Sequence, residues 1–168
     1  MTIRKFTLGD IKNIINVDII SYKTQFSEIP SEEMAFELEG RKTGYEDLKS
    51  GKDRAFVACE GDTVVGYVQY GKDSEGKEWI KRLYILPEIQ NQGLGRKLLG
   101  KTLDGLKNTK VYIDVWEDNE RASHLYSSLG FRPTGRKIPF LNKKGEVDGF
   151  EVEMAKELSY FRSSRFKN

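Results

Sequence analysis

The sequence predicts a single α/β domain of the α+β kind, in which helices cover both faces of a mixed sheet. Three observations support this fold class. The first third of the chain has apolar residues at helical spacing, and the middle has consecutive strand-like runs joined by turns, as in an antiparallel meander. The last half alternates strand and helix patterns before two closing strands. Elements in this order predict a mixed sheet with helices on both faces.

The first third is expected to be helical after one short strand. The expected elements are a strand at 2–6, helices at 10–20 and 31–38, and a further helical turn at 45–49. Ser31 follows Pro30 and is a typical N-cap for the second helix. Gly40 and Gly44 are expected to break that helix.

The meander is expected at residues 54–86, where the hydrophobic period changes to that of strands. The expected strands are 55–59, 64–70 and 79–86. The first two flank a Glu-Gly-Asp-Thr turn at 60–63, which predicts a hairpin, and Pro87 ends the third.

The second half contributes two helices and three strands. The expected elements are a helix at 93–106, a strand at 111–115, a helix at 119–129, and closing strands at 131–141 and 150–158. Leucines follow one face of the first of these helices, and Gly130 is a typical C-terminal signal for the second. Alternation along the strand at 111–115 places Tyr112, Asp114 and Trp116 on one face, opposite Val111, Ile113 and Val115.

Length and charge limit the class of protein. The chain has 168 residues, enough for one domain, here assigned to residues 1–158, and a basic tail at residues 159–168. Its 28 basic and 26 acidic residues are well mixed and give a net charge of +2, which argues against a nucleic-acid-binding protein. The tail is expected to be a solvated chain end.

Other features point to a cytoplasmic protein without a membrane span. No apolar run approaches the roughly 18 residues that a span needs, and the first residues lack the apolar core of a signal peptide. Cys59 is the only cysteine, so no intrachain disulfide is expected. His124 is the only histidine and has no ligand partners, so no metal site is expected. The oligomeric state is left open, and a homodimer is compatible with the sequence.

The turn at residues 90–97 has the features of a phosphate-binding site. It lies between the strand that Pro87 ends and an amphipathic helix, whose first N–H groups and positive dipole end favour anions. Gly93 and Gly95 allow the backbone to approach a bulky pyrophosphate. A P-loop needs Gly-Lys-Ser/Thr, but Arg96-Lys97-Leu98 follows Gly95, and a dinucleotide-binding fingerprint needs a small residue where Leu98 stands. An ordinary tight turn remains the alternative.

This turn resembles the acetyl-CoA motif of the GNAT superfamily of N-acetyltransferases, here Gln90-x-x-Gly93-x-Gly95. Three further segments resemble the family's fourth strand, its fifth strand with the asparagine that follows, and its Asn-x-x-Ala-x-x-x-Tyr-x-x-x-Gly-Phe helix; they are residues 82–87, 112–119 and 119–131. The resemblance covers roughly residues 2–158.

The resemblance implies a central, mostly antiparallel sheet of six to seven strands, and direct transfer of acetyl from acetyl-CoA to a primary amine. The cofactor-binding residues that it implies are Leu83, Tyr84, Ile85, Gln90, Asn91, Gln92, Gly93, Leu94, Gly95, Arg96, Lys97 and Asn119. A backbone N–H of residues 83–85 is expected to stabilise the oxyanion. Asn119 is also a candidate helix N-cap.

Two residues are expected to move protons. Tyr126 lies about two helical turns after Asn119 and is the candidate acid for the leaving thiolate, with a core-packing role as the alternative. Asp114 is the candidate base, because some protein N-terminal acetyltransferases of this family have a carboxylate there, twelve residues before the tyrosine, as here. A water chain without a single base is the alternative.

Within the family the chain resembles the PaiA-type spermidine/spermine acetyltransferases, including the Tyr22-x-x-x-Phe26 region. A polyamine is therefore the expected acceptor, and its cationic groups call for carboxylates. The expected substrate residues are Glu28, Glu33, Trp116 and Glu117. Two alternatives remain: an acetyltransferase for protein N-termini or lysines, favoured by Asp114, and a CoA-binding sensor without turnover.

Overall fold

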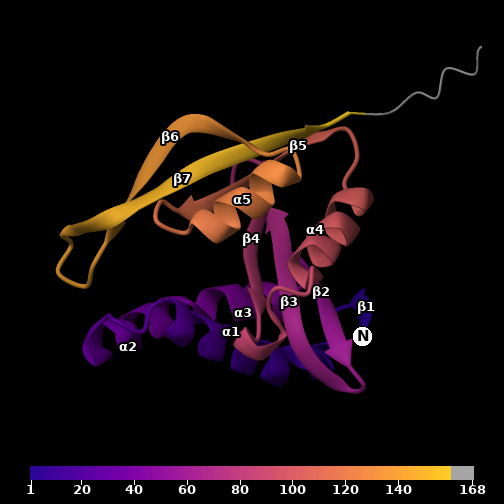
Figure 1. Cartoon of the computed structure of the whole chain (residues 1–168), viewed down its shortest axis with the longest axis horizontal. Helices are drawn as coiled ribbons and strands as arrows, with labels where there is room; N and C mark the ends of the chain where they lie inside the picture. The colour runs from indigo at the N-terminus through magenta and orange to yellow at the C-terminus, as the bar shows by residue number, and fades with distance from the viewer. Residues whose placement is uncertain (160–168) are drawn as a thin grey trace, which may run out of the picture.

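The computed structural model describes residues 1–159, in which seven strands form one sheet (Figure 1). Most of the predicted basic tail, residues 160–168, lies outside the described residues. The elements in chain order are β1 (Thr2–Lys5), the 3₁₀ turn η1 (Leu8–Asp10), α1 (Ile11–Gln25), α2 (Ser31–Gly40), α3 (Lys42–Lys49), β2 (Asp53–Glu60), β3 (Thr63–Lys72), β4 (Glu78–Ile85), the 3₁₀ turn η2 (Pro87–Ile89), α4 (Leu94–Gly105), β5 (Thr109–Trp116), α5 (Glu120–Ser128), β6 (Arg132–Leu141) and β7 (Val147–Leu158).

The strand order is β1-β2-β3-β4-β5-β7-β6. Each neighbouring pair is antiparallel except β4 and β5, which are parallel and are joined through α4. The predicted mixed, mostly antiparallel sheet is therefore confirmed. The single parallel pair matters for function, because a parallel connection brings the helix that follows β4 back over one face of the sheet.

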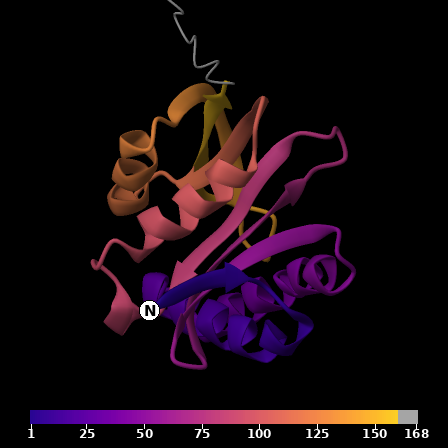
Figure 2. The same cartoon turned by 90° about the vertical axis from the view of Figure 1, so that its right-hand side faces the viewer.

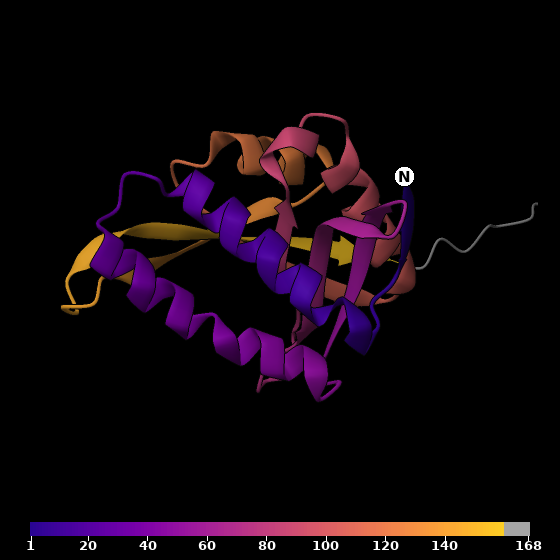
Figure 3. The same cartoon turned by 90° about the horizontal axis from the view of Figure 1, so that it is seen from below.

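Helices cover the two faces of the sheet separately. Figure 2 shows α4 and α5 on one face and the N-terminal helices on the other, and Figure 3 shows α1 crossing the strands on that second face. Two apolar clusters hold the layers together. The larger includes the fully buried Leu98 and Leu99 of α4, the helix that packs on β2, β3 and β4, and the smaller includes Ile14, Val17 and Leu48. Each fully buried leucine contributes roughly 1.5–3 kcal/mol.

β5 shows the alternation that the sequence predicts. Val111, Ile113 and Val115 are buried beneath α4 and α5, whereas the side chains between them lie on the opposite face and are half-buried. Asp114 and Trp116 therefore face the N-terminal helices.

The prediction that Gly44 breaks a helix is wrong. Gly44 lies inside α3. Its role is close approach: a Cβ at this position would lie 2.6 Å from Nη2 of Arg82 on β4. α3 has a glycine here because the Arg82 guanidinium occupies the space that any larger side chain would need. β7 also begins earlier than expected, at Val147.

The long β6–β7 hairpin reaches across to α2 (Figure 1). At its tip the backbone N–H of Lys143 donates to Glu33 Oε1 at 2.7 Å, and its ammonium binds Glu32. α2 has no buried residue, so these contacts help to hold it in place.

Among the described helices, none is long and apolar enough to cross a lipid bilayer.

Candidate active site

A cleft opens where β4 and β5 separate. The two strands pair only from Glu78 to Ile80 and from Val111 to Ile113, and then diverge. The remainder of each strand lines a cavity of about 700 Å³, with residues 81–85 on one side and 114–116 on the other. Beyond Ile80 the edge of β4 that faces β5 has no strand partner, so its peptide groups can bind a ligand, except for the Ile85 carbonyl, which accepts from Ser21 and Gln90.

The N-terminus of α4 points into this cleft without a cap. Gly93 has a left-handed backbone (φ 75°), and no side chain accepts from the first N–H groups of the helix. α5 differs, because Asn119 Oδ1 accepts from the N–H of Ala122 at 3.0 Å. Gly93, Leu94 and Gly95 all line the cleft. Uncapped N–H groups beside a cavity form an anion site, as a phosphate requires.

Gln90 fastens the loop before α4. Its amide donates to the carbonyl of Ile85 at 2.8 Å and accepts from Arg121 at 2.6 Å, so it joins the end of β4 to α5. Arg96 and Arg121 line the same end of the cleft. This end therefore combines helix N–H groups with two guanidinium groups, an arrangement suited to an anionic ligand.

Tyr126 lies in α5 and reaches the cleft from the side of α4. Its side chain is 7% exposed and packs at a ring distance of 6.2 Å from Phe131. Burial, with a further contribution from nearby Tyr84, raises the pKa of the Tyr126 phenol well above its ordinary value. The phenol is therefore protonated at neutral pH and can donate a hydrogen bond or a proton.

Asp114 faces the cleft from β5. Its Oδ1 is buried and accepts no hydrogen bond within the described part of the chain. Burial, followed by the negative charges of Glu151 and Glu153, raises the pKa of Asp114 to about 7. A carboxylate with this pKa takes up and releases a proton near neutral pH, as a general base must.

The opposite end of the cleft is acidic and aromatic. Its carboxylates come from α2, β5 and β7 and are Glu33, Glu37, Asp114, Asp148 and Glu151. Its aromatic side chains are Tyr22, Phe26, Trp116 and Phe140. Trp116 makes edge contacts with Phe26 and Phe140, at ring distances of 6.2 and 5.5 Å. The cleft is therefore electrostatically divided: Arg96 and Arg121 lie at one end and these carboxylates at the other, where the guanidinium groups of Arg41 and Arg82 are both held beside the buried Asp18.

Arg41 lines the cleft beside this acidic end, and an internal partner neutralises its charge. Its guanidinium binds both oxygens of the fully buried Asp18, at 2.9 and 2.7 Å, and stacks on the rings of Tyr22 and Tyr84. Burial alone would raise the pKa of Asp18, but the hydrogen bonds and charge of Arg41 lower it. Arg41 thus serves chiefly to hold α3 and α1 together beside the cleft.

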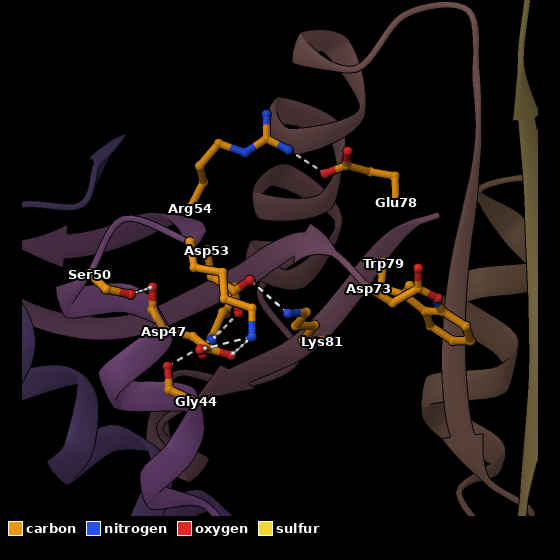
Figure 4. A network of polar contacts seen from close by, with 11 residues as sticks. Gly44, Asp47, Ser50, Asp53, Arg54, Asp73, Glu78, Trp79 and Lys81 are labelled. Atoms are coloured by element: carbon orange, nitrogen blue, oxygen red, sulfur yellow. Dashed lines mark hydrogen bonds and ion pairs between the residues drawn. The ribbon is translucent and has the colours of Figure 1, made fainter. Parts of the chain in front are cut away.

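Lys81, which lines the cleft on β4, is similarly occupied. Figure 4 shows its ammonium directed at Asp53, at 2.6 Å. The Asp53 carboxylate is fully buried and also accepts from the Gln69 amide at 2.7 Å. That amide in turn donates to the carbonyl of Gly44, so the network joins α3 to the sheet.

The structure brings most of the predicted site residues to one cleft. Those that line it are Leu83, Tyr84, Ile85, Gln90, Asn91, Gly93, Leu94, Gly95, Arg96, Asn119, Asp114, Tyr126, Glu33 and Trp116. Gln92 and Lys97 are exposed and do not line it. Glu28 is exposed after α1, and Glu117 binds Lys137 at 2.8 Å, so neither expected substrate carboxylate is at the cleft.

Other cleft residues were not singled out as site residues from the sequence. They include Arg121, Phe140 and Glu151, and Glu37 was only one of many candidate carboxylates. The alternation of β7 gives Glu151 and Glu153 the same face, but only the pairing of β7 with β5 brings Glu151 beside Trp116.

Residues 21–131 match the family model of the acetyltransferase (GNAT) family. The chain is 30% identical over 102 residues to N-alpha-acetyltransferase RimI of Mycobacterium tuberculosis, covering 59% of this chain and 65% of that protein. It is 32% identical over 87 residues to a spermine/spermidine N(1)-acetyltransferase of Bacillus subtilis, covering 45% and 57%. The matches therefore span less than two thirds of either relative.

Among solved structures, the fold is similar to that of the PaiA N-acetyltransferase of Thermoplasma acidophilum in complex with coenzyme A. The TM-score is 0.71 at 19% identity, and the superposition covers 93% of this chain and 98% of that one. At this identity the similarity concerns the fold.

Proposed function

Because the chain belongs to the acetyltransferase (GNAT) family, we propose that it transfers acetyl from acetyl-CoA to the primary amine of a small cationic acceptor, a polyamine. The observation that carries the proposal is the division of the cleft. One end offers uncapped helix N–H groups and guanidinium groups to an anion, and the other offers carboxylates and aromatic rings to a cation. Asp114 and Tyr126 line the same cleft.

The residues present fit the cofactor. The N–H groups after Gly93, together with Arg96 and Arg121, are suited to its pyrophosphate. The unpaired edge of β4 is suited to the amide groups of its pantetheine arm. Gly95 allows the start of α4 to approach α5 and β4 closely, since a Cβ there would lie 3.3 Å from Leu125 and 3.4 Å from Ile85. Bound acetyl-CoA supplies an activated acetyl thioester.

Asp114 is the proposed base. An amine at the acidic, aromatic end of the cleft arrives as an ammonium ion and must lose a proton before it attacks the thioester. The carboxylate of Asp114 is ionised above a pH of about 7, and its free Oδ1 can accept that proton. Glu151 and Glu153 assist, because their charges raise the basicity of Asp114. A water relay that ends on Asp114 uses the same chemistry over a longer distance.

Tyr126 is the proposed acid. Its buried phenol keeps its proton at neutral pH and can deliver it to the sulfur that leaves. A thiolate in the same dry environment is also destabilised, which raises its affinity for a proton and offsets the weaker acidity of the buried phenol. Asn119 caps α5 and thereby fixes the orientation of the helix that carries Tyr126.

A protein N-terminus is the second candidate acceptor. Asp114 precedes Tyr126 by the spacing that some N-terminal acetyltransferases of the family have, and the RimI protein of Mycobacterium tuberculosis is among the relatives. The contact of Lys143 with Glu32 and Glu33 joins the β6–β7 hairpin to α2 beside the acidic end of the cleft, which favours a slim acceptor over a folded protein.

A thiol-release assay with acetyl-CoA and a panel of amines tests the proposal. The panel contains spermidine, putrescine, free lysine and short peptides with a free N-terminus. We expect thiol release with the polyamines, and mass spectrometry should identify the monoacetylated amine. Release with the peptides alone would favour the second candidate, and no release with any amine would contradict acetyl transfer.

A further inference from the structure

Two half-buried carboxylates at the acidic end of the cleft, Glu37 and Glu151, form no ion pair within residues 1–159; Arg41, whose charge acts on Glu37, is itself paired with Asp18. Glu37 of α2 accepts only the hydroxyl of Tyr22, at 3.3 Å. The side chain of Glu151 on β7 takes part in no hydrogen bond or ion pair in this part of the chain, although it lines the cleft and is half-buried. Carboxylates withdrawn from water without a counter-charge are unfavourable, so a ligand that supplies the charge is expected there.

The neighbouring carboxylates are already engaged. Glu153, two residues after Glu151 on the same face of β7, binds Thr134 and Arg136. Glu33 accepts the backbone N–H of Lys143. Apart from Asp114 at the proposed reaction centre and the exposed Asp148, the unsatisfied negative charge at this end of the cleft is therefore on Glu37 and Glu151. Burial, and then the charge of Glu37, raise the pKa of Glu151, which indicates that the two groups interact across the cleft.

Aromatic rings complete this part of the cleft. Glu151 is the β-sheet partner of Trp116, whose ring also contacts Phe26 and Phe140. The Tyr22 ring packs against Phe26 in a tilted arrangement, with 4.7 Å between the ring centroids. Aromatic faces together with carboxylates bind ammonium groups, because the rings contribute cation–π attraction while the carboxylates contribute charge.

The sheet register sets the distance from the reaction centre. Asp114 lies directly opposite Glu153, so Glu151 is its diagonal neighbour across the β5–β7 pair. Diagonal neighbours are about 7 Å apart, a distance that a chain of roughly three or four methylenes spans. An amine beside Asp114 can therefore carry a second ammonium that reaches Glu151.

We propose that Glu37 and Glu151, with the ring of Trp116, form a distal ammonium subsite that selects acceptors with a second cationic amine a few methylenes from the reacting one. This inference rests on the proposed function and adds two specificity-determining residues to it. The subsite distinguishes a diamine from a monoamine of the same length.

Putrescine and n-butylamine test the subsite, because they have the same carbon chain and differ in the second ammonium. Calorimetric titration into protein saturated with CoA measures their binding without turnover. We expect putrescine to bind the wild-type protein about 10- to 100-fold more tightly than butylamine. Glu151→Gln should remove about tenfold of this preference, and the double change with Glu37→Gln should remove nearly all of it.

Two matched variants control for a loss of general negative charge. Glu157→Gln lies on the same strand, where Glu157 is exposed and pairs with Lys110, and Glu39→Gln lies on α2, where Glu39 pairs with Lys42. Both should keep the preference for putrescine. Equal affinity of the wild-type protein for the two amines, or equal losses for both amines in Glu151→Gln, would overturn the subsite.

The binding comparison and the thiol-release assay can fail independently of each other. Tight, Glu151-dependent binding of putrescine without thiol release would contradict the proposed reaction but support the subsite. Thiol release at equal kcat/KM with both amines, together with equal affinity, would support the reaction and remove the subsite.

Discussion

Replacing Asp114 by asparagine should make the protein more stable and less active, and the gain in stability should depend on pH. The pKa of Asp114 is about 7 in the folded protein and near 4 in the unfolded chain. The folded state therefore holds a proton more tightly than the unfolded state. The stabilisation from this proton is complete below pH 4 and is lost as the pH rises to about 7. The asparagine variant has no titrating group at this position, so it does not lose stability in this way as the pH rises.

The magnitude follows from the two pKa values. At about 1.4 kcal/mol per pH unit, the gap between them corresponds to roughly 4 kcal/mol. Asp114 is only partly buried, so solvent screening reduces this to about 1–2 kcal/mol. We therefore expect Asp114→Asn to gain about 1–2 kcal/mol over the wild type between pH 4.5 and pH 8, or a few degrees in Tm at the higher pH.

Urea denaturation of both proteins at pH 4.5 and pH 8 measures this difference. Asp62→Asn, at an exposed aspartate in the β2–β3 turn, is the control and should change little with pH. The same stability difference between Asp114→Asn and wild type at both pH values would refute the reasoning. In activity assays, kcat/KM of the wild type should rise with pH through about 7, and this rise should be absent in Asp114→Asn.

Three further predictions concern the proposed acid Tyr126, the packing of Gly149 against Trp116, and the buried Asp18–Arg41 pair. Tyr126→Phe should lower kcat about 100-fold with little change in the KM for acetyl-CoA; an unchanged kcat in steady-state assays would exclude Tyr126 as the acid. Gly149→Ala should raise the KM for the amine several-fold and leave CoA affinity intact, because a Cβ there would lie 2.2 Å from the ring of Trp116 at a backbone φ of 133°. Unaltered amine kinetics and tryptophan fluorescence would argue against it. Asp18→Asn should destabilise the fold by about 3 kcal/mol in denaturant titrations, because it leaves the buried Arg41 guanidinium without its counter-charge; a loss below about 1 kcal/mol would be inconsistent with this pair.

The elements that form the α4 end of the cleft were largely predictable from the sequence, because their features are local. The leucine face of α4, the glycine pair before it and the alternation of β5 are all patterns within one element. The position of Asn119 predicted its capping bond to Ala122. Such patterns survive folding because each element presents one face to the core.

The acceptor end was only partly predictable, because it depends on the pairing of distant segments. Lys143 and Glu33 are 110 positions apart, and no local pattern indicates that the hairpin tip contacts α2. Glu117 was expected to bind the substrate, but the pairing of β6 with β7 places Lys137 where the two form an ion pair. Gly44 has the local signature of a helix break, and only the approach of Arg82 explains why a helix keeps it.

The central claim is that the N-terminus of α4 holds the cofactor in this cleft. Isothermal titration of acetyl-CoA into wild-type protein and into Gly93→Val tests it, because valine disfavours the left-handed backbone at this position. We expect one binding site in the wild type and an affinity at least about tenfold lower in the folded variant. No binding to folded wild-type protein, or equal affinity for both proteins, would contradict the claim.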